Sequence, residues 1–277
     1  MRRRSGPQVL TPCVVLRVSD LGDADRIVTL LTAAFGKISA VARGARSSRR
    51  RFGAALVPFG YGEALLQERP GQELWVLSEL DMSQGFANLP LELARFGYAS
   101  YACELCLHLC PLQVPETTVL RLLLALLEVL DRLPIAQKPT PLLLRVFELQ
   151  VLQAVGLGLQ LTDCAACGQQ VPPLPLLPLD VERGGVLCQG CYSGPIPAGL
   201  GPRGGGLSQA LRTTLSALAK ICLIDGHPEM FAVDGSMQQT IKQLLRSVIE
   251  HHIGTRLRTI EFIEKVNLFE RERGCLG

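Results

Sequence analysis

Short apolar and β-branched runs, one of which alternates with polar positions at a period of two, dominate the first third of the chain. In one of them Ile38, Ala40 and Ala42 share a face, as they would in a half-buried strand. A turn signal, Arg-Pro-Gly-Gln at 69–72, separates the last two runs. The runs cover residues 13–18, 25–32, 36–43, 61–67 and 74–80. Five short strands at this spacing predict a small barrel or sandwich.

The hydrophobic period becomes helical after about residue 86. Helices are predicted for residues 91–110, 115–133, 140–156, 207–224 and 236–254. Pro111 and Pro134 end the first two, and Thr140 followed by Pro141 is typical of a capped helix start.

The last predicted helix carries signals at both ends. Ser236 with Gln239 fits a capping box, and Gly254 fits the matching stop. Between about 160 and 206 the chain is rich in Pro and Gly and is expected to be irregular. The pattern therefore predicts an α+β protein, with a β domain at residues 1–85 and an α-helical domain at 86–277.

Four of the ten cysteines form a C-x2-C…C-x2-C pattern inside this irregular segment, at about 160–195. They are Cys164, Cys167, Cys188 and Cys191. One tight turn aims each pair at a common ion, and four thiolates close a tetrahedral site. The pattern predicts a structural Zn²⁺ without a catalytic position. Two disulfides or a redox C-x-x-C are the alternatives, disfavoured by a reducing compartment and by the lack of a βαβ pattern.

A single-sign basic segment lies early in the chain, with no acidic residue between its ends. The predicted DNA-binding residues are Lys37, Arg43, Arg46, Arg49, Arg50 and Arg51. The rings of Phe52, Phe59 and Tyr61 follow, so we expect charges to hold phosphates and rings to stack bases of a single strand. A solvated or disordered charge run is the alternative. No groove-reading helix accompanies the segment, so little sequence specificity is expected.

Composition and missing motifs narrow the function classes. Across 277 residues, 48% are hydrophobic and the net charge is only +3, so clustering of charge matters more than its sum. Gly199 to Gly204 matches G-x-G-x-x-G, but it follows no predicted strand and is interpreted as a flexible linker. No other catalytic motif is present, and we expect no enzyme activity. The Leu-rich stretch 119–133 is charged and too short to span a bilayer, so a cytoplasmic, nucleoid-associated protein is expected.

Several stretches together resemble the RecO family of bacterial recombination mediators. They are residues 22–28, 32–37, 41–46, 52–59, 147–149 with Leu152 and Gly156, the four-cysteine module with Gly184 and Gly185, and 254–259. The ordered set spans nearly the whole chain. The resemblance implies an N-terminal five-stranded OB-fold barrel followed by an α-helical domain that carries the zinc module.

The same resemblance implies a DNA repair and recombination role. It consists of binding single- and double-stranded DNA, annealing complementary strands and, with RecR, helping RecA replace single-strand-binding protein. RecF and the acidic tail of single-strand-binding protein are further partners that it suggests. A second basic face for DNA or an acidic tail is expected from Lys242, Arg246, Arg256 and Arg258. The alternative is a zinc-ribbon transcription or RNA-binding module, but Arg183 is the only basic residue between 172 and 187.

Overall fold

The structure is a computed structural model that describes residues 6–48, 51–52, 56–134, 137–197, 199–201, 204–223 and 233–274. The chain divides into two compact units. The barrel unit is Met1–Lys138 with Arg258–Gly277, and the cysteine unit is Pro139–Leu257. The boundary predicted between residues 85 and 86 falls after the last strand of the barrel, and the division into domains there stays a prediction.

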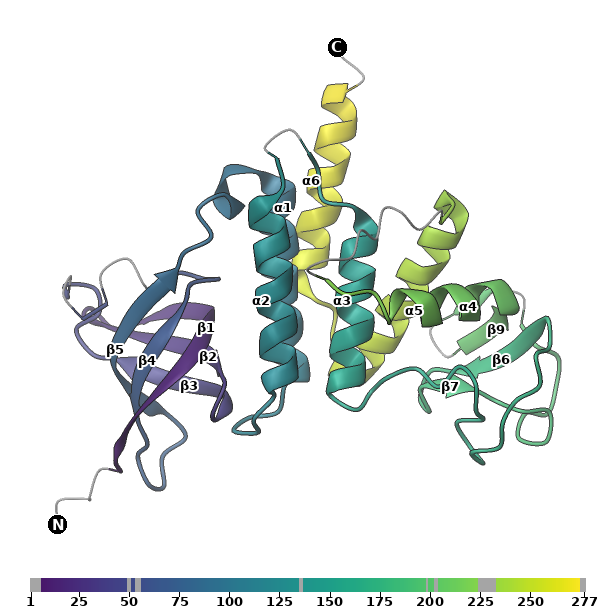
Figure 1. The fold of residues 1–277 in the computed structure, drawn as a ribbon, viewed down its shortest axis with the longest axis horizontal. Helices are drawn as coiled ribbons and strands as arrows, with labels where there is room; N and C mark the ends of the chain where they lie inside the picture. Colours follow the sequence, from purple (N-terminus) through teal and green to yellow (C-terminus); the bar gives the residue numbers. More distant parts are fainter. Residues whose placement is uncertain are drawn as a thin grey trace. The chain divides into compact units, whose positions relative to one another are not determined.

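The barrel consists of five strands, as the five short apolar runs predicted. These are β1 (Gln8–Leu21), β2 (Asp25–Thr32), β3 (Gly36–Ala42), β4 (Tyr61–Gln67) and β5 (Trp75–Gln84). They close in the order β1-β2-β3-β5-β4, with β3 and β5 parallel and the other pairs antiparallel (Figure 1). The predicted turn between β4 and β5 is formed, because Gln72 N donates to Arg69 O at 2.9 Å.

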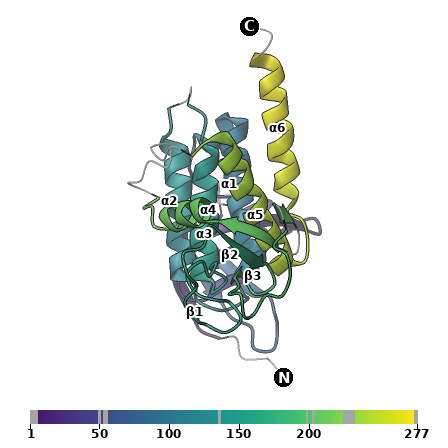
Figure 2. The ribbon, with the colours of Figure 1, turned by 90° about the vertical axis from the view of Figure 1, so that its right-hand side faces the viewer.

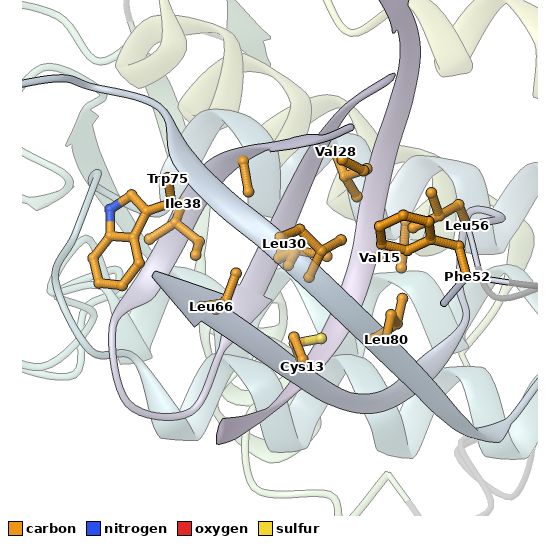
Figure 3. Close-up of a cluster of buried hydrophobic side chains, with 14 of the residues drawn as sticks. Cys13, Val15, Val28, Leu30, Ile38, Phe52, Leu56, Leu66, Trp75 and Leu80 are labelled. Atoms are coloured by element: carbon orange, nitrogen blue, oxygen red, sulfur yellow. The ribbon is translucent and has the colours of Figure 1, made fainter. Parts of the chain in front are cut away.

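Apolar side chains fill the barrel from end to end. In Figure 3, Trp75 and Ile38 lie at one end, Leu30 lies near the middle, and Phe52 and Leu56 lie at the other end. The inward positions of each strand supply most of this core, as alternation requires. Phe52 comes from the loop after β3 rather than from a strand, so part of the basic segment belongs to the core.

The helices of the barrel unit pack beside the barrel. The short helix η1 (Leu89–Leu91) leads to α1 (Leu93–Leu109), which contacts α2 (Thr117–Arg132) and α6 (Arg258–Gly274) (Figure 1). The first two α-helices end near the predicted prolines, whereas α6 was not predicted. Among the described residues, none of the helices is both long and apolar enough to cross a membrane.

The start of α6 is capped by a side chain from α1. The carboxylate of Glu104 accepts from the backbone N of Arg258 at 3.0 Å, from the backbone N of Thr259 at 2.9 Å and from the Thr259 hydroxyl at 2.5 Å. Free N–H groups at a helix start carry partial positive charge, so a carboxylate satisfies and stabilises them. Glu104 thereby fixes the C-terminal helix to α1.

The cysteine unit combines three helices with a small sheet. The helices are α3 (Pro141–Ala154), α4 (Gln209–Leu218) and α5 (Gly235–Ile253), which contact one another (Figure 2). Thr140 caps α3 as predicted, and Gly254 ends α5 with a left-handed φ of 67°. The predicted capping box at the start of α5 is wrong. Asp234 is the N-cap, and its carboxylate accepts from Met237 N at 2.8 Å.

The segment expected to be irregular forms a four-stranded sheet. Its order is β7 (Gly185–Val186), β6 (Leu176–Asp180), β9 (Gly204–Ser208) and β8 (Leu200–Gly201). The interpretation of residues 199–206 as a flexible linker is therefore wrong for its described part. Gly204 is required here because a Cβ would lie 2.0 Å from the Leu179 carbonyl oxygen, and its φ is 133°. The glycines allow close strand pairing instead of flexibility.

Candidate nucleic-acid interface and metal centre

The described part of the basic segment is tied to the start of β2. Gly44 N donates to the Asp25 carboxylate at 2.8 Å, and Arg46 N donates to Ala24 O at 3.2 Å. Beyond it, Leu80 N donates to Arg51 O at 3.2 Å. We call residues 43–52 the basic loop. These bonds hold its backbone against the barrel on both sides of residues 49–50.

Three arginines of the basic loop point charge towards solvent. Arg43, Arg46 and Arg51 are exposed. The Arg51 guanidinium donates to Arg43 O at 2.8 Å and lies 5.1 Å from the centre of the Phe52 ring. Arg49 and Arg50 lie outside the described residues. The arrangement brings part of the predicted DNA-binding set together on one anchored loop.

Two of the rings expected to stack bases are buried. Phe52 is in the barrel core and Phe59 packs edge-on against Phe96, with ring centres 5.5 Å apart. The prediction that they face a nucleic acid is wrong, because both have apolar partners inside the protein. Tyr61 is half-buried at the start of β4.

Lys37 is engaged by the protein itself. Its ammonium group donates to Leu107 O at 2.5 Å in the last turn of α1, where a helix carries partial negative charge. Burial lowers the pKa of Lys37. Its neighbour Gly36 lies so close to the α1–α2 connection that a Cβ would sit 1.7 Å from Val114 O. Lys37 therefore joins the barrel to the helices, and a contact between Lys37 and DNA stays a prediction.

The four predicted ligand cysteines converge in the cysteine unit. The sulfurs of Cys164, Cys167, Cys188 and Cys191 all lie within 4.8 Å of one another. The Sγ atoms of Cys167 and Cys188 are 3.8 Å apart. A tetrahedral site with metal–sulfur bonds of about 2.3 Å requires sulfurs about 3.8 Å apart. The donor set and its spacing thus fit a metal site of the type that Zn²⁺ prefers.

Two tight turns present these sulfurs. In the first, Gly168 N donates to Cys164 O at 2.8 Å, and in the second, Cys191 N donates to Cys188 O at 3.1 Å. The Cys188 N–H points at the Cys164 sulfur at 3.3 Å and is the main cause that lowers the pKa of that thiol to about 6, whereas the neighbouring sulfurs raise the pKa of Cys191 to about 12. A thiolate is the form that binds metal, so the backbone favours ligation.

Arg183 is the only basic residue in the sequence between the two cysteine pairs. Arg183 pairs with Asp180 at 2.5 Å, so its charge is locally compensated. In the second predicted basic face, Arg246 pairs with Glu250 at 2.9 Å. Lys242, Arg246 and Arg256 belong to the cysteine unit and Arg258 to the barrel unit, so this face stays a prediction.

A closed five-stranded barrel with a basic loop, followed by helices and a four-cysteine metal-binding cluster, defines an OB-type α+β protein. Two sequence models of known families match it. The one described as Recombination protein O N terminal matches residues 6–86, and Recombination protein O C terminal matches residues 90–261. The chain belongs to the RecO family.

Curated relatives cover almost all of the chain. A DNA repair protein RecO from Anaeromyxobacter sp. (strain K) is 40% identical over 253 residues, 91% of this chain and 94% of the relative. Proteins of the same name from Symbiobacterium thermophilum and Myxococcus xanthus are 36% and 33% identical over 259 and 260 residues. They cover 91% and 92% of this chain, and 94% and 96% of the relatives. The family consists of recombination mediators rather than enzymes, in line with the prediction from the missing catalytic motifs.

Proposed function

We propose that this protein binds single- and double-stranded DNA through the basic loop and anneals complementary strands. The observation that carries the proposal is the anchored loop, which holds exposed Arg43, Arg46 and Arg51 at one place on a barrel. Single-strand-binding barrels hold backbone phosphates with such charges. The annealing role is inferred from family membership. The basic loop suits it, because two polyanions approach each other only when their charge is neutralised.

We also propose, from the family, that the protein acts with RecR to help RecA replace single-strand-binding protein on DNA. RecF and the acidic tail of single-strand-binding protein remain candidate partners. The proposal predicts that annealing needs no ATP and that stimulation of RecA loading requires added RecR.

The four-cysteine cluster is proposed to hold Zn²⁺ as a structural ion. Four thiolates complete a tetrahedral shell, so no ligand position remains for substrate or water. Zinc bound here would fasten the turn at Cys164 to the turn at Cys188 and so stabilise the unit. Arg183 is paired with Asp180 beside this cluster, which supports a scaffold instead of a nucleic-acid contact.

The test is fluorescence anisotropy on a labelled oligonucleotide at several salt concentrations. If Arg43, Arg46, Arg49, Arg50 and Arg51 each contact one phosphate, log affinity against log salt should have a slope of about −3.5. Changing Arg49, Arg50 and Arg51 together to Ala should flatten the slope by about 2. Annealing should fall in parallel, while the melting temperature hardly moves, because the described side chain of the three, Arg51, is exposed and changes at loop positions outside the core cost little stability.

Arg183→Ala is the matched control, because it removes an exposed arginine from the cysteine unit. It should leave both affinity and salt slope unchanged. If the triple variant binds like the wild type and Arg183→Ala fails to bind, the DNA contacts lie on the cysteine unit and the proposal is wrong.

A further inference from the structure

A cleft of about 680 Å³ opens in the cysteine unit between the first cysteine turn and α4. One wall comes from Leu161, Val171 and Pro173, which flank the turn, and the other from Arg212 and Thr213 of α4. Lys220, just after α4, also lines it. This volume is within the range of small-molecule sites, about 300–1,000 Å³.

Arg212 is an unusual residue for such a wall. Only 8% of it is exposed, and its Nη2 donates to Leu174 O at 2.6 Å. Its Nε is buried without a hydrogen-bond partner, and Arg212 forms no ion pair with any residue that the structure describes. A buried guanidinium without a counter-charge is costly, so an anion entering the cleft would relieve it.

The remaining lining suits an anion that carries an apolar group. Of the described residues that line the cleft, none is acidic. Asp163 follows the lining residue Thr162 in sequence, and its carboxylate accepts from the Thr162 hydroxyl at 2.8 Å. Lys220 adds an exposed positive charge, while Leu161, Val171 and Pro173 offer an apolar wall. A bare phosphate would leave that wall uncovered.

We propose that this cleft binds one nucleotide unit, with the phosphate on Arg212 and Lys220 and the base against Leu161, Val171 and Pro173. Arginine binds phosphate through charge-assisted N–H bonds, and Arg212 lines the cleft without a carboxylate partner among the described residues. The nucleotide can be free or part of a bound strand, since the chemistry is the same. The site uses no residue of the basic loop, so it is independent of the proposed DNA interface.

The experiment is calorimetric titration of the full-length protein with thymidine 5′-monophosphate, and with thymidine and inorganic phosphate as partial ligands. The nucleotide should bind at least about tenfold more tightly than thymidine or inorganic phosphate, because each of these makes only some of the contacts with the cleft. If thymidine and its monophosphate bind equally tightly, the phosphate contributes nothing to the affinity and Arg212 has no role in binding. No heat from the nucleotide at millimolar concentration would overturn the site.

Thr213 gives a matched pair of variants that should both fold, because this residue is exposed on α4. Thr213→Glu places a carboxylate beside Arg212 and should weaken nucleotide binding by about tenfold or more through like-charge repulsion. Thr213→Gln has the size of glutamate without its charge and should bind the nucleotide more tightly than Thr213→Glu. Equal affinity of the two variants for the nucleotide contradicts the proposal.

Two further arms separate the sources and the sites. Changing Arg43, Arg46 and Arg51 together to Ala should leave the affinity for the free nucleotide unchanged, even where oligonucleotide binding is lost. If a short thymidine oligonucleotide binds this triple variant and Thr213→Glu abolishes that residual binding, the cleft takes nucleotides from a strand. If only the monophosphate binds, the cleft takes free nucleotides. A peptide with an apolar C-terminal residue is the last competitor. If it displaces both the monophosphate and the oligonucleotide, while these two do not displace each other, the nucleotide assignment is overturned.

Discussion

Truncating Phe52 to alanine should loosen the basic loop as well as the barrel core. The Phe52 ring is 2% exposed and lies with Leu56 at one end of the barrel (Figure 3). Removing a buried phenylalanine ring costs about 3–5 kcal/mol, a large part of the roughly 5–15 kcal/mol that stabilises a typical domain. Arg51 precedes Phe52 and its guanidinium lies over the ring, so the arginine loses its support at the same time.

The consequence for DNA binding is smaller than the loss of stability. Ordering a long side chain on binding costs about 0.5–1.5 kcal/mol, so a loosened Arg43 and Arg51 should weaken single-strand affinity severalfold without changing charge. Urea unfolding measures the first effect, and anisotropy at a temperature where the variant is folded measures the second. Phe52→Leu keeps most of the buried volume and should show a reduced version of both effects.

Two results would refute this reasoning. A stability loss of less than about 1 kcal/mol would mean that the ring is not a core residue. A full loss of 3–5 kcal/mol with wild-type affinity would mean that the position of the loop does not depend on the ring.

Three further predictions follow from the other contacts. Cys164→Ser with Cys167→Ser should remove bound zinc in elemental analysis and lower the melting temperature; native protein that folds without metal contradicts a structural ion. Glu104→Ala should cost about 1–3 kcal/mol in urea unfolding, because it strips the acceptor from the start of α6; a cost near zero would show that water replaces this cap. Lys37→Met should leave the salt slope of DNA binding unchanged, whereas Arg46→Ala should flatten it by about 0.7. The reverse order would return Lys37 to the DNA interface.

The barrel was predictable because its strands bury one face. Short apolar and β-branched runs placed strands at 25–32 and 61–67, and the structure has β2 and β4 over those residues. The four-cysteine cluster was predictable for a similar reason, since each C-x2-C pair lies within one local turn. Both features depend on residues close together in sequence or on a simple period.

Other elements were missed because distant contacts define them. The strand β9 begins with three glycines, which indicate flexibility when taken alone, yet Gly204 pairs with Asp180 across the sheet. The helix α6 has a weak apolar period, and its start is capped by Glu104, more than 150 residues away in the chain. Neither the pairing nor the cap leaves a local signal.

The same distinction separates two basic residues of the predicted DNA-binding set. Lys37 and Arg46 look alike in the sequence, since both lie in a stretch free of acids. Lys37 is taken by the Leu107 carbonyl because the β2–β3 turn meets the end of α1, and the closeness of Gly36 to Val114 makes that contact tight. Arg46 stays exposed because its backbone, not its side chain, forms the anchoring bond to the barrel. Conservative replacement by lysine should therefore be tolerated at Arg46, where only charge is used.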